Sequence, residues 1–222
     1  MVTRALDVVL LGPPGAGKGT QARRLGEAFD LLHVSTGALL REEVARGSAL
    51  GVEAKAFMSR GELVPEELVG RMLLKRLHSS QAAIGCAYDG YPLTTGQAHL
   101  LDGLLAELNR RLDVALSLGV GDDELVVRMT GRRSCPSCGA VYHLTTHPPK
   151  DSTGCDACGA AVVQRDDDRE EVIRERLRVY KETTAPVLDF YRARGILGEV
   201  DGTGTPDVVF ARLRDAMRRV KR

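Results

Sequence analysis

The sequence lacks tryptophan, and aromatic residues make up only 4% of its 222 residues. It also lacks a dominant charge, because 31 basic and 30 acidic residues leave a formal net charge of +1. Proteins that bind nucleic acids use basic surfaces and aromatic side chains that stack on bases. The composition therefore argues against a nucleic-acid partner, although the net charge alone says nothing about a local patch.

Long apolar runs are absent as well. None approaches the roughly 18 residues that a membrane-spanning helix needs, so we expect no membrane partner. The first seven residues carry one cation and only a short apolar stretch, which does not resemble a signal peptide. With 43% hydrophobic and 27% charged residues, the composition is ordinary for a soluble globular protein, and we expect a cytoplasmic one.

Lysine is scarce too. Only six of the 31 basic residues are lysine, so arginine supplies the other 25. A compositional bias explains this total without any function. Each arginine must therefore qualify as a site residue by its position.

Short apolar runs alternate with helical patterns along most of the chain. Runs typical of buried parallel strands lie at Leu6 to Leu11, Ile84 to Tyr88, Val114 to Leu118 and Ile196 to Val200. Helical patterns lie at Lys18 to Phe29, Glu66 to Leu77, Gly96 to Arg110 and Val172 to Arg194. This alternation predicts an α/β fold with a doubly wound parallel sheet and right-handed crossovers.

Two stretches interrupt the alternation. Residues 35–64 have a mostly helical pattern without a strong strand. Residues 131–164 are rich in Gly, Pro, Cys and Thr and hold little apolar material. We interpret both as inserts that leave the core and return to it.

A glycine-rich loop, Gly12 to Thr20, connects the first apolar run to a helical pattern. Its glycines let backbone N–H groups surround phosphate oxygens, and the following helix N-terminus adds a favourable dipole. Lys18 would reach the β- and γ-phosphates as a point charge. The dinucleotide-binding fingerprint fails on spacing, because position 20 is threonine where glycine is required. The loop thus predicts a site for a nucleoside triphosphate; the alternative is a simple tight turn.

The order Lys18-Gly19-Thr20 resembles the phosphate loop of the adenylate kinase family of nucleoside monophosphate kinases. Further motifs similar to that family follow along nearly the whole chain. They are Ser35-Thr36-Gly37 with Arg41, Gly61-Glu62-Leu63-Val64-Pro65, Asp89-Gly90-Tyr91-Pro92 with Gln97, Arg128, Gly131-Arg132-Arg133, Val141-Tyr142, Arg165 with Asp166-Asp167-Asp168, Arg176, and Val200-Asp201-Gly202-Thr203-Gly204.

The resemblance implies a P-loop core whose doubly wound parallel sheet has five strands, with two inserts. The core would comprise residues 1–34, 65–130 and 165–222. Residues 35–64 would be a helical insert that binds the nucleoside monophosphate, and residues 131–164 a zinc-binding lid. The implied reaction is ATP + AMP = 2 ADP, with Mg²⁺ bound to ATP. Nucleotides would be its only partners, because the long-lid form resembles monomeric family members.

The resemblance also assigns the donor site. Lys18, Arg132, Arg165 and Arg176 would be the catalytic residues that converge on the transferred phosphoryl group, and lid closure would exclude water. Asp89 would hold Mg²⁺ through water. For each arginine, the alternative is a solvated surface charge. The implied ATP-binding residues are Gly15, Ala16, Gly17, Lys18, Gly19, Thr20, Arg128, Arg132, Val141, Tyr142 and Gly204.

In the implied acceptor site, Thr36 and Gln97 would recognise the adenine of AMP, and Arg41 would bind its phosphate. Gln97 offers a donor and an acceptor, which suits the edge of adenine; an exposed helix position is the alternative. The implied AMP-binding residues are Thr36, Arg41, Glu62, Leu63, Val64, Gly90, Tyr91, Pro92, Leu93, Gln97, Arg165 and Arg176.

Two residues of the acceptor site depart from the family pattern. Leu93 stands where the family has an arginine that grips the acceptor phosphate, and Ala38 stands where it has an aspartate. Losing one charged hydrogen bond costs about 1.5–3 kcal/mol. We therefore expect weaker binding of the acceptor phosphate, by roughly ten- to a hundredfold.

Four cysteines lie within the second insert as two Cys-x-x-Cys pairs, Cys135 with Cys138 and Cys155 with Cys158. Four thiolates at this spacing favour a closed, structural zinc site, and the insert has too little apolar material to fold without one. Two disulfides or an iron centre are the alternatives. Cys86 lies in an apolar run and is interpreted as a buried hydrophobic residue.

Three hypotheses for the function remain at this point. We favour a working adenylate kinase with an atypical acceptor-phosphate site. The alternative is a weakly active or altered-specificity paralogue that acts in nucleotide binding or regulation. The third is a nucleic-acid-binding zinc ribbon attached to a P-loop that powers another reaction.

Overall fold

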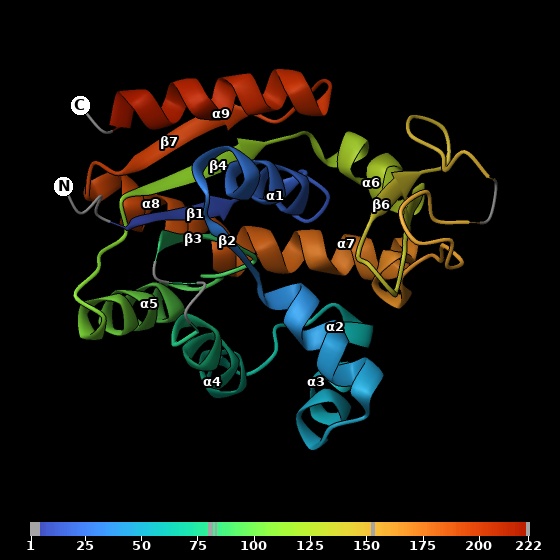
Figure 1. The fold of residues 1–222 in the computed structure, drawn as a ribbon, viewed down its shortest axis with the longest axis horizontal. Helices are drawn as coiled ribbons and strands as arrows, with labels where there is room; N and C mark the ends of the chain where they lie inside the picture. The colour runs from blue at the N-terminus through green and yellow to red at the C-terminus, as the bar shows by residue number, and fades with distance from the viewer. Residues whose placement is uncertain (1–4, 80–81, 83, 152–153, 221–222) are drawn as a thin grey trace.

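The computed structural model describes residues 5–79, 82, 84–151 and 154–220. Its core is a parallel sheet with the strand order β2-β3-β1-β4-β7 (Figure 1). This confirms the predicted α/β fold with a five-stranded parallel sheet. The strands are β1 (Leu6–Leu11), β2 (Leu32–Ser35), β3 (Gly85–Asp89), β4 (Val114–Gly119) and β7 (Leu197–Asp201).

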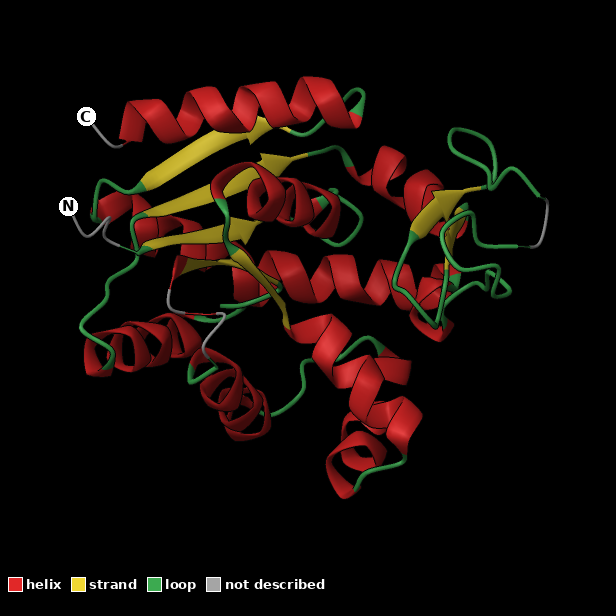
Figure 2. Cartoon of the chain, in the orientation of Figure 1, coloured by secondary structure: helices red, strands yellow, loops and turns green. Residues whose placement is uncertain are grey.

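Helices cover both faces of this sheet (Figure 2). Because side chains alternate along a strand, Val8 and Leu10 of β1 point to one apolar cluster, and Val9 and Leu11 point to the other. The first cluster is closed by α1 (Lys18–Phe29), α6 (Asp122–Thr130), α7 (Glu170–Val179) and α9 (Pro206–Val220). The second is closed by α4 (Glu66–Leu77), α5 (Thr95–Glu107) and α8 (Ala185–Ala193).

Three of these elements were not indicated by the apolar patterns. Strand β2 is only four residues long and includes His33 and Ser35, so no apolar run marks it. Helices α6 and α9 were also missed, although both close the apolar cluster on the α1 face of the sheet.

The predicted helix from Gly96 to Arg110 ends earlier than expected, at Glu107. Asn109 takes a left-handed conformation with φ 55°, which breaks the helix. The next residue, Arg110, turns into the protein instead of continuing the helix. Its guanidinium forms a two-bond ion pair with Asp7, whose side chain is fully buried, and one of these bonds joins Nε to Oδ2 at 2.9 Å.

The predicted helix from Val172 to Arg194 is interrupted. A π-helical segment, η3 (Tyr180–Thr184), separates α7 from α8, and Ala185 donates its N–H to the Tyr180 carbonyl, five residues earlier. Pro186 has no N–H, so it cannot continue the regular hydrogen-bond ladder. On the two sides of this segment, α7 packs on one face of the sheet and α8 on the other.

The first interruption of the α/β pattern forms α2 (Thr36–Arg46) and α3 (Ala49–Arg60), which pack closely. A Cβ at Gly51 would lie only 2.1 Å from the Glu43 carbonyl oxygen, so glycine is required at this crossing. The second interruption forms an antiparallel pair, β5 (Arg132–Ser134) and β6 (Val141–His143). A 3₁₀ turn, η2 (Asp166–Asp168), then leads to α7. None of the described helices is both long enough and apolar enough to cross a membrane.

Candidate active site

The glycine-rich loop lies at the carboxyl end of β1 and leads into α1. Gly12 adopts φ 133°, and a Cβ there would lie 2.6 Å from the Leu118 carbonyl oxygen of the neighbouring strand. Lys18 Nζ donates to the carbonyl oxygens of Gly12 and Pro13, at 2.8 and 2.9 Å. Burial lowers the pKa of Lys18 to about 8 in spite of nearby Asp89. The loop is thus wrapped around one ammonium group.

Asp89 ends β3 directly beside this loop. Its Oδ2 lies 3.5 Å from His33 Nε2 on β2, and a Cβ at Gly19 would lie only 3.1 Å from the same oxygen. Burial alone would raise the pKa of Asp89, but His33 and Lys18 outweigh it and lower the pKa. Asp89 is therefore an ionised carboxylate at the strand end, where a hard cation such as Mg²⁺ could be held through water.

Four arginines from distant parts of the chain form one electrostatic cluster, and two of them, Arg132 and Arg176, also act on Lys18 of the phosphate loop. Arg132 forms a two-bond ion pair with buried Asp168, and Arg176 Nη1 lies 2.7 Å from Asp167 Oδ2. Burial lowers the pKa of Arg165, and the charges of Arg132 and Arg41 lower it further. With Lys18, these arginines make five cations that interact with three carboxylates: Asp89, Asp167 and Asp168. The surplus of positive charge suits a polyphosphate.

The predicted acceptor residues lie on α2, α5 and α7, in the segments that follow α3 and β3, and directly before η2. Thr36 Oγ1 donates to the Gly90 carbonyl at 2.7 Å, and the Arg41 guanidinium lies against Gly37. Gln97 is buried, and its Oε1 accepts the backbone N–H of Leu93 at 2.7 Å. The Leu93 side chain is half-buried. It offers no charge and no hydrogen bond to a phosphate.

The predicted adenine-binding residues of the donor site divide into two groups. Arg128 donates to the Gly202 carbonyl at 3.1 Å, which brings it to the loop that contains Gly204. The Tyr142 side chain, in contrast, is buried within the second insert, and its hydroxyl contacts Cys155.

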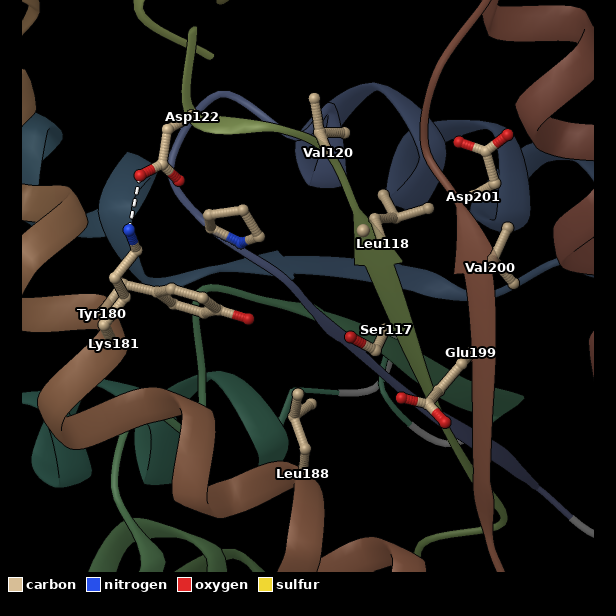
Figure 3. Close-up of a pocket in the computed structure, with 12 residues that line it drawn as sticks. Ser117, Leu118, Val120, Asp122, Tyr180, Lys181, Leu188, Glu199, Val200 and Asp201 are labelled. Carbon is tan, nitrogen blue, oxygen red and sulfur yellow. Dashed lines mark hydrogen bonds and ion pairs between the residues drawn. The ribbon is translucent and has the colours of Figure 1, made fainter. Parts of the chain in front are cut away.

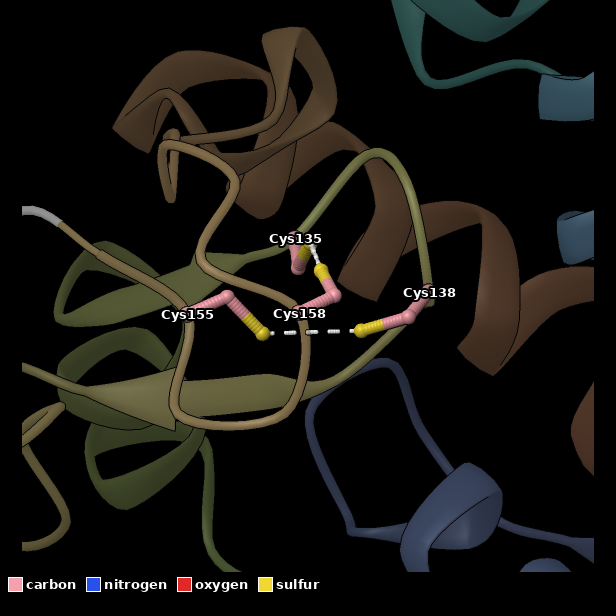
Figure 4. A group of neighbouring side chains, drawn as sticks. All are labelled: Cys135, Cys138, Cys155 and Cys158. Atoms are coloured by element: carbon pink, nitrogen blue, oxygen red, sulfur yellow. Dashed lines mark hydrogen bonds between the residues drawn. The ribbon is translucent and has the colours of Figure 1, made fainter.

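The four cysteines of the insert lie together (Figure 4). Their sulfur atoms all lie within 4.8 Å of one another; Cys135 and Cys158 are 3.4 Å apart, and Cys138 and Cys155 are 3.5 Å apart. Four sulfurs bound to one zinc ion at about 2.3 Å would lie about 3.8 Å apart, whereas a disulfide requires about 2.05 Å. None of these four cysteines forms a disulfide. The donor set therefore fits one tetrahedral metal ion.

Comparisons with known proteins agree with this geometry. The family model described as adenylate kinase matches residues 10–196. The adenylate kinase of Archaeoglobus fulgidus is 47% identical over 216 residues, which cover 97% of this chain and 100% of the relative. That of Thermodesulfovibrio yellowstonii is 50% identical, over 92% of this chain and 95% of the relative. The chain belongs to the adenylate kinase family.

Membership confirms the resemblance and the prediction of an adenylate kinase enzyme. Within this adenylate kinase, the predicted catalytic residues Lys18, Arg132, Arg165 and Arg176 do come together. Other predicted side chains point elsewhere: Glu62 pairs with Arg60 at 2.7 and 2.8 Å on the surface, and Val64 packs into the apolar core. Any nucleotide contact at those two positions would involve the backbone, and the individual roles of the predicted residues remain predictions.

The sequence reasoning missed the partners of the arginines predicted to be catalytic. Asp167 and Asp168 were noted only as part of a motif, although both are buried and each pairs with an arginine. Three consecutive acidic residues directly after Arg165 were the available signal. His33, beside Asp89, gave no signal in the sequence.

A cavity of about 540 Å³ lies beside this adenylate kinase site, at the carboxyl ends of β4 and β7 (Figure 3). Pro13 of the phosphate loop is in its wall, and the ion pair between Asp122 and Lys181 lies at one side. Its described lining includes Val200 and Asp201, which belong to the motif that ends at Gly204, but none of the residues assigned individually to ATP or AMP. The cavity therefore adds no individually assigned residue to the nucleotide site.

Proposed function

We propose that this adenylate kinase transfers a phosphoryl group reversibly between ATP and AMP, with an acceptor-phosphate site that works without an arginine at position 93. The observation that supports this most directly is the electrostatic cluster that links Lys18 of the phosphate loop to Arg132 and Arg176, and Arg132 in turn to Arg165. Phosphoryl transfer needs aligned nucleotides, exclusion of water and positive charge around the transferred group. Five cations with three carboxylates meet the last requirement.

We assign a role to each of these residues from its position in the structure. Lys18 and the loop amides hold the donor phosphates, and Arg128 covers the adenine beside Gly204. Arg132, Arg165 and Arg176 stabilise charge on the transferred phosphoryl group. Mg²⁺, held through water by Asp89, would neutralise phosphate charge when bound. The proposed boundaries are a core of residues 1–34, 65–130 and 165–222, a monophosphate-binding insert of residues 35–64 and a lid of residues 131–164.

Zinc is the metal we propose for the four cysteines. Soft thiolates in tetrahedral geometry favour it, and four protein ligands leave no open position for catalysis. When bound, it would supply folding energy to an insert whose described apolar core is small. Metal analysis of protein purified without chelator should give about one zinc per chain.

Leu93 supports a second candidate, a weakly active or altered-specificity paralogue. A leucine cannot replace the charged hydrogen bonds of an arginine, and Ala38 supplies no carboxylate. The Arg41 guanidinium lies beside Gly37 and interacts electrostatically with Arg165 and Arg176. These three arginines can therefore bind the acceptor phosphate in the absence of an arginine at position 93. For this reason we favour a working enzyme with weakened binding of the acceptor phosphate.

Measuring ADP formation from ATP plus AMP separates the two candidates. Turnover equal to that of a control without enzyme would refute the working kinase. The variant Leu93→Arg should then lower the KM for AMP, or raise kcat, by about ten- to a hundredfold. Leu144→Arg introduces the same charge at an exposed position of the second insert and should change neither constant. If Leu93→Arg changes neither the KM for AMP nor kcat, the acceptor site binds phosphate in an arrangement that has no place for an arginine at position 93.

Acceptor specificity tests the proposed roles of Thr36 and Gln97. AMP should give a higher kcat/KM than CMP, UMP or GMP. A clear preference for one of those three would show that these residues recognise another base.

A further inference from the structure

The ring of Tyr142 lies inside the metal-binding insert. Its side chain is only 5% exposed and packs in one small cluster with Cys135 and Cys155. The ring stacks on His147, with centroids 5.8 Å apart and planes at 10°. A ring held in this way has no free face to offer a nucleotide base.

The hydroxyl of Tyr142 has two partners in the second cysteine pair. The backbone N–H of Asp156 donates to the hydroxyl oxygen at 2.8 Å, and the Cys155 sulfur lies 3.3 Å from the same oxygen. Because the oxygen accepts from Asp156, its own hydrogen is available for donation. A metal-bound thiolate can only accept, so the hydrogen is directed to Cys155.

The two cysteine pairs are otherwise built alike. Cys135 and Cys155 each donate a backbone N–H to the carbonyl five residues later, at 2.9 and 2.8 Å, and each accepts the N–H of a glycine. Among the hydrogen bonds of the described residues, only Cys155 of the four receives a bond from a side chain other than cysteine. The hydroxyl thus distinguishes one ligand from the other three.

We propose that Tyr142 is a positioning residue of the metal site, which donates a hydrogen bond to the Cys155 thiolate and fixes the adjacent backbone through Asp156. This inference rests on the zinc site proposed above. Groups that hydrogen-bond to metal ligands orient them and tune the electron density that they supply. The family resemblance assigned Tyr142 to the ATP site, whereas its side chain serves the metal site in this chain.

The test compares Tyr142→Phe with Tyr191→Phe. Tyr191 is fully buried in the core, and its hydroxyl has no hydrogen-bond partner among the described residues, so it controls for loss of a buried hydroxyl. Zinc-loaded proteins are mixed with an excess of a chromophoric chelator, and zinc release is followed by absorbance. Tyr142→Phe should weaken zinc binding about tenfold or more, whereas Tyr191→Phe should behave as the wild type.

Cobalt supplies a readout that general destabilisation does not move. In Co²⁺-loaded Tyr142→Phe, the sulfur-to-cobalt charge-transfer band should shift to lower energy, because a thiolate without its hydrogen bond is more electron-rich. His147→Ala removes the stacked ring but keeps the hydroxyl, so its band should match that of the wild type. A band shift in His147→Ala as large as that in Tyr142→Phe would overturn the proposal, because it would show that packing of the ring, and not the hydroxyl, determines the energy of the band.

The outcomes separate this inference from the zinc proposal. Wild-type protein that retains neither zinc nor cobalt contradicts the metal site itself. Metal binding by the wild type with the same release rate and the same band in Tyr142→Phe overturns only the role of Tyr142. Complete loss of metal in Tyr142→Phe, with full retention in Tyr191→Phe, supports the role, because the ring is unchanged.

Discussion

Raising the pH should weaken ATP binding through Lys18. The ammonium group is enclosed by the phosphate loop and donates to the carbonyls of Gly12 and Pro13. Burial lowers its pKa from 10.5 to about 8; Asp89 opposes this shift, and Arg132 and Arg176 add to it. The lysine in the free enzyme therefore loses its charge at a pH at which an ordinary lysine keeps it.

The magnitude follows from the pKa. A group with a pKa of about 8 is about nine-tenths charged at pH 7 and about one-tenth charged at pH 9. If only the charged form binds the triphosphate, kcat/KM for ATP should fall about tenfold between those two values. The fall in kcat should occur at a higher pH than the fall in kcat/KM for ATP. Bound phosphates favour the ammonium form of Lys18 and so raise its pKa in the complex.

The assay measures initial rates with varied ATP and saturating AMP from about pH 7 to 10, at constant ionic strength, with nucleotides separated by chromatography. Lys18→Arg is the matched control: a guanidinium stays charged over this range, so the alkaline decline should disappear even if the rate is lower. A flat kcat/KM for ATP up to pH 9.5 in the wild type, or an unchanged decline in Lys18→Arg, would refute the reasoning.

Three further outcomes follow from the buried charges. Arg110→Leu should lower the free energy of unfolding in urea by about 3–5 kcal/mol, because it leaves Asp7 buried and unpaired; adding Asp7→Asn should recover part of that loss. Arg132→Lys loses the two-bond pairing with Asp168 and should lower kcat at saturating substrates by about a hundredfold or more. Burial raises the pKa of Asp167, but the surrounding arginines outweigh it and lower the pKa overall. Its stabilisation is therefore present above its ordinary pKa and is lost as the pH falls through the folded-state value, so urea titrations below about pH 4 should show a steeper loss in the wild type than in Asp167→Asn.

The parts of the fold that were predicted from the sequence depend on short segments. Helices α1 and α4 have the predicted bounds, because their apolar spacing is contained within a dozen residues each. Strand β2 was missed since its place in the sheet depends on pairing with β3, which lies about 50 residues away in the sequence. The end of α5 was wrong for a similar reason: Arg110 pairs with Asp7, which lies 103 residues earlier in the sequence.

The same distinction holds for the site. The phosphate loop and the cysteine pairs are contiguous motifs, and their geometry agrees with the prediction. The surroundings of Tyr142 could not be predicted from a contiguous motif. Its hydroxyl contacts Cys155, which lies 13 residues later in the sequence. Nor does any local pattern indicate that Asp168, rather than a solvent molecule, pairs with Arg132.

The effect of Leu93 depends on the charges around it rather than on leucine alone. Arg41, Arg165 and Arg176 each lower the pKa of Asp167, so all three contribute to one region of positive electrostatic potential. A phosphate in that region would keep most of its attraction when one arginine of the family pattern is absent. The loss would then be that of one charged hydrogen bond and not of the whole site. Meanwhile the backbone N–H of Leu93 still holds Gln97, which any residue other than proline can do. Leucine in place of arginine at position 93 should therefore weaken binding of the acceptor phosphate and leave recognition of the base intact.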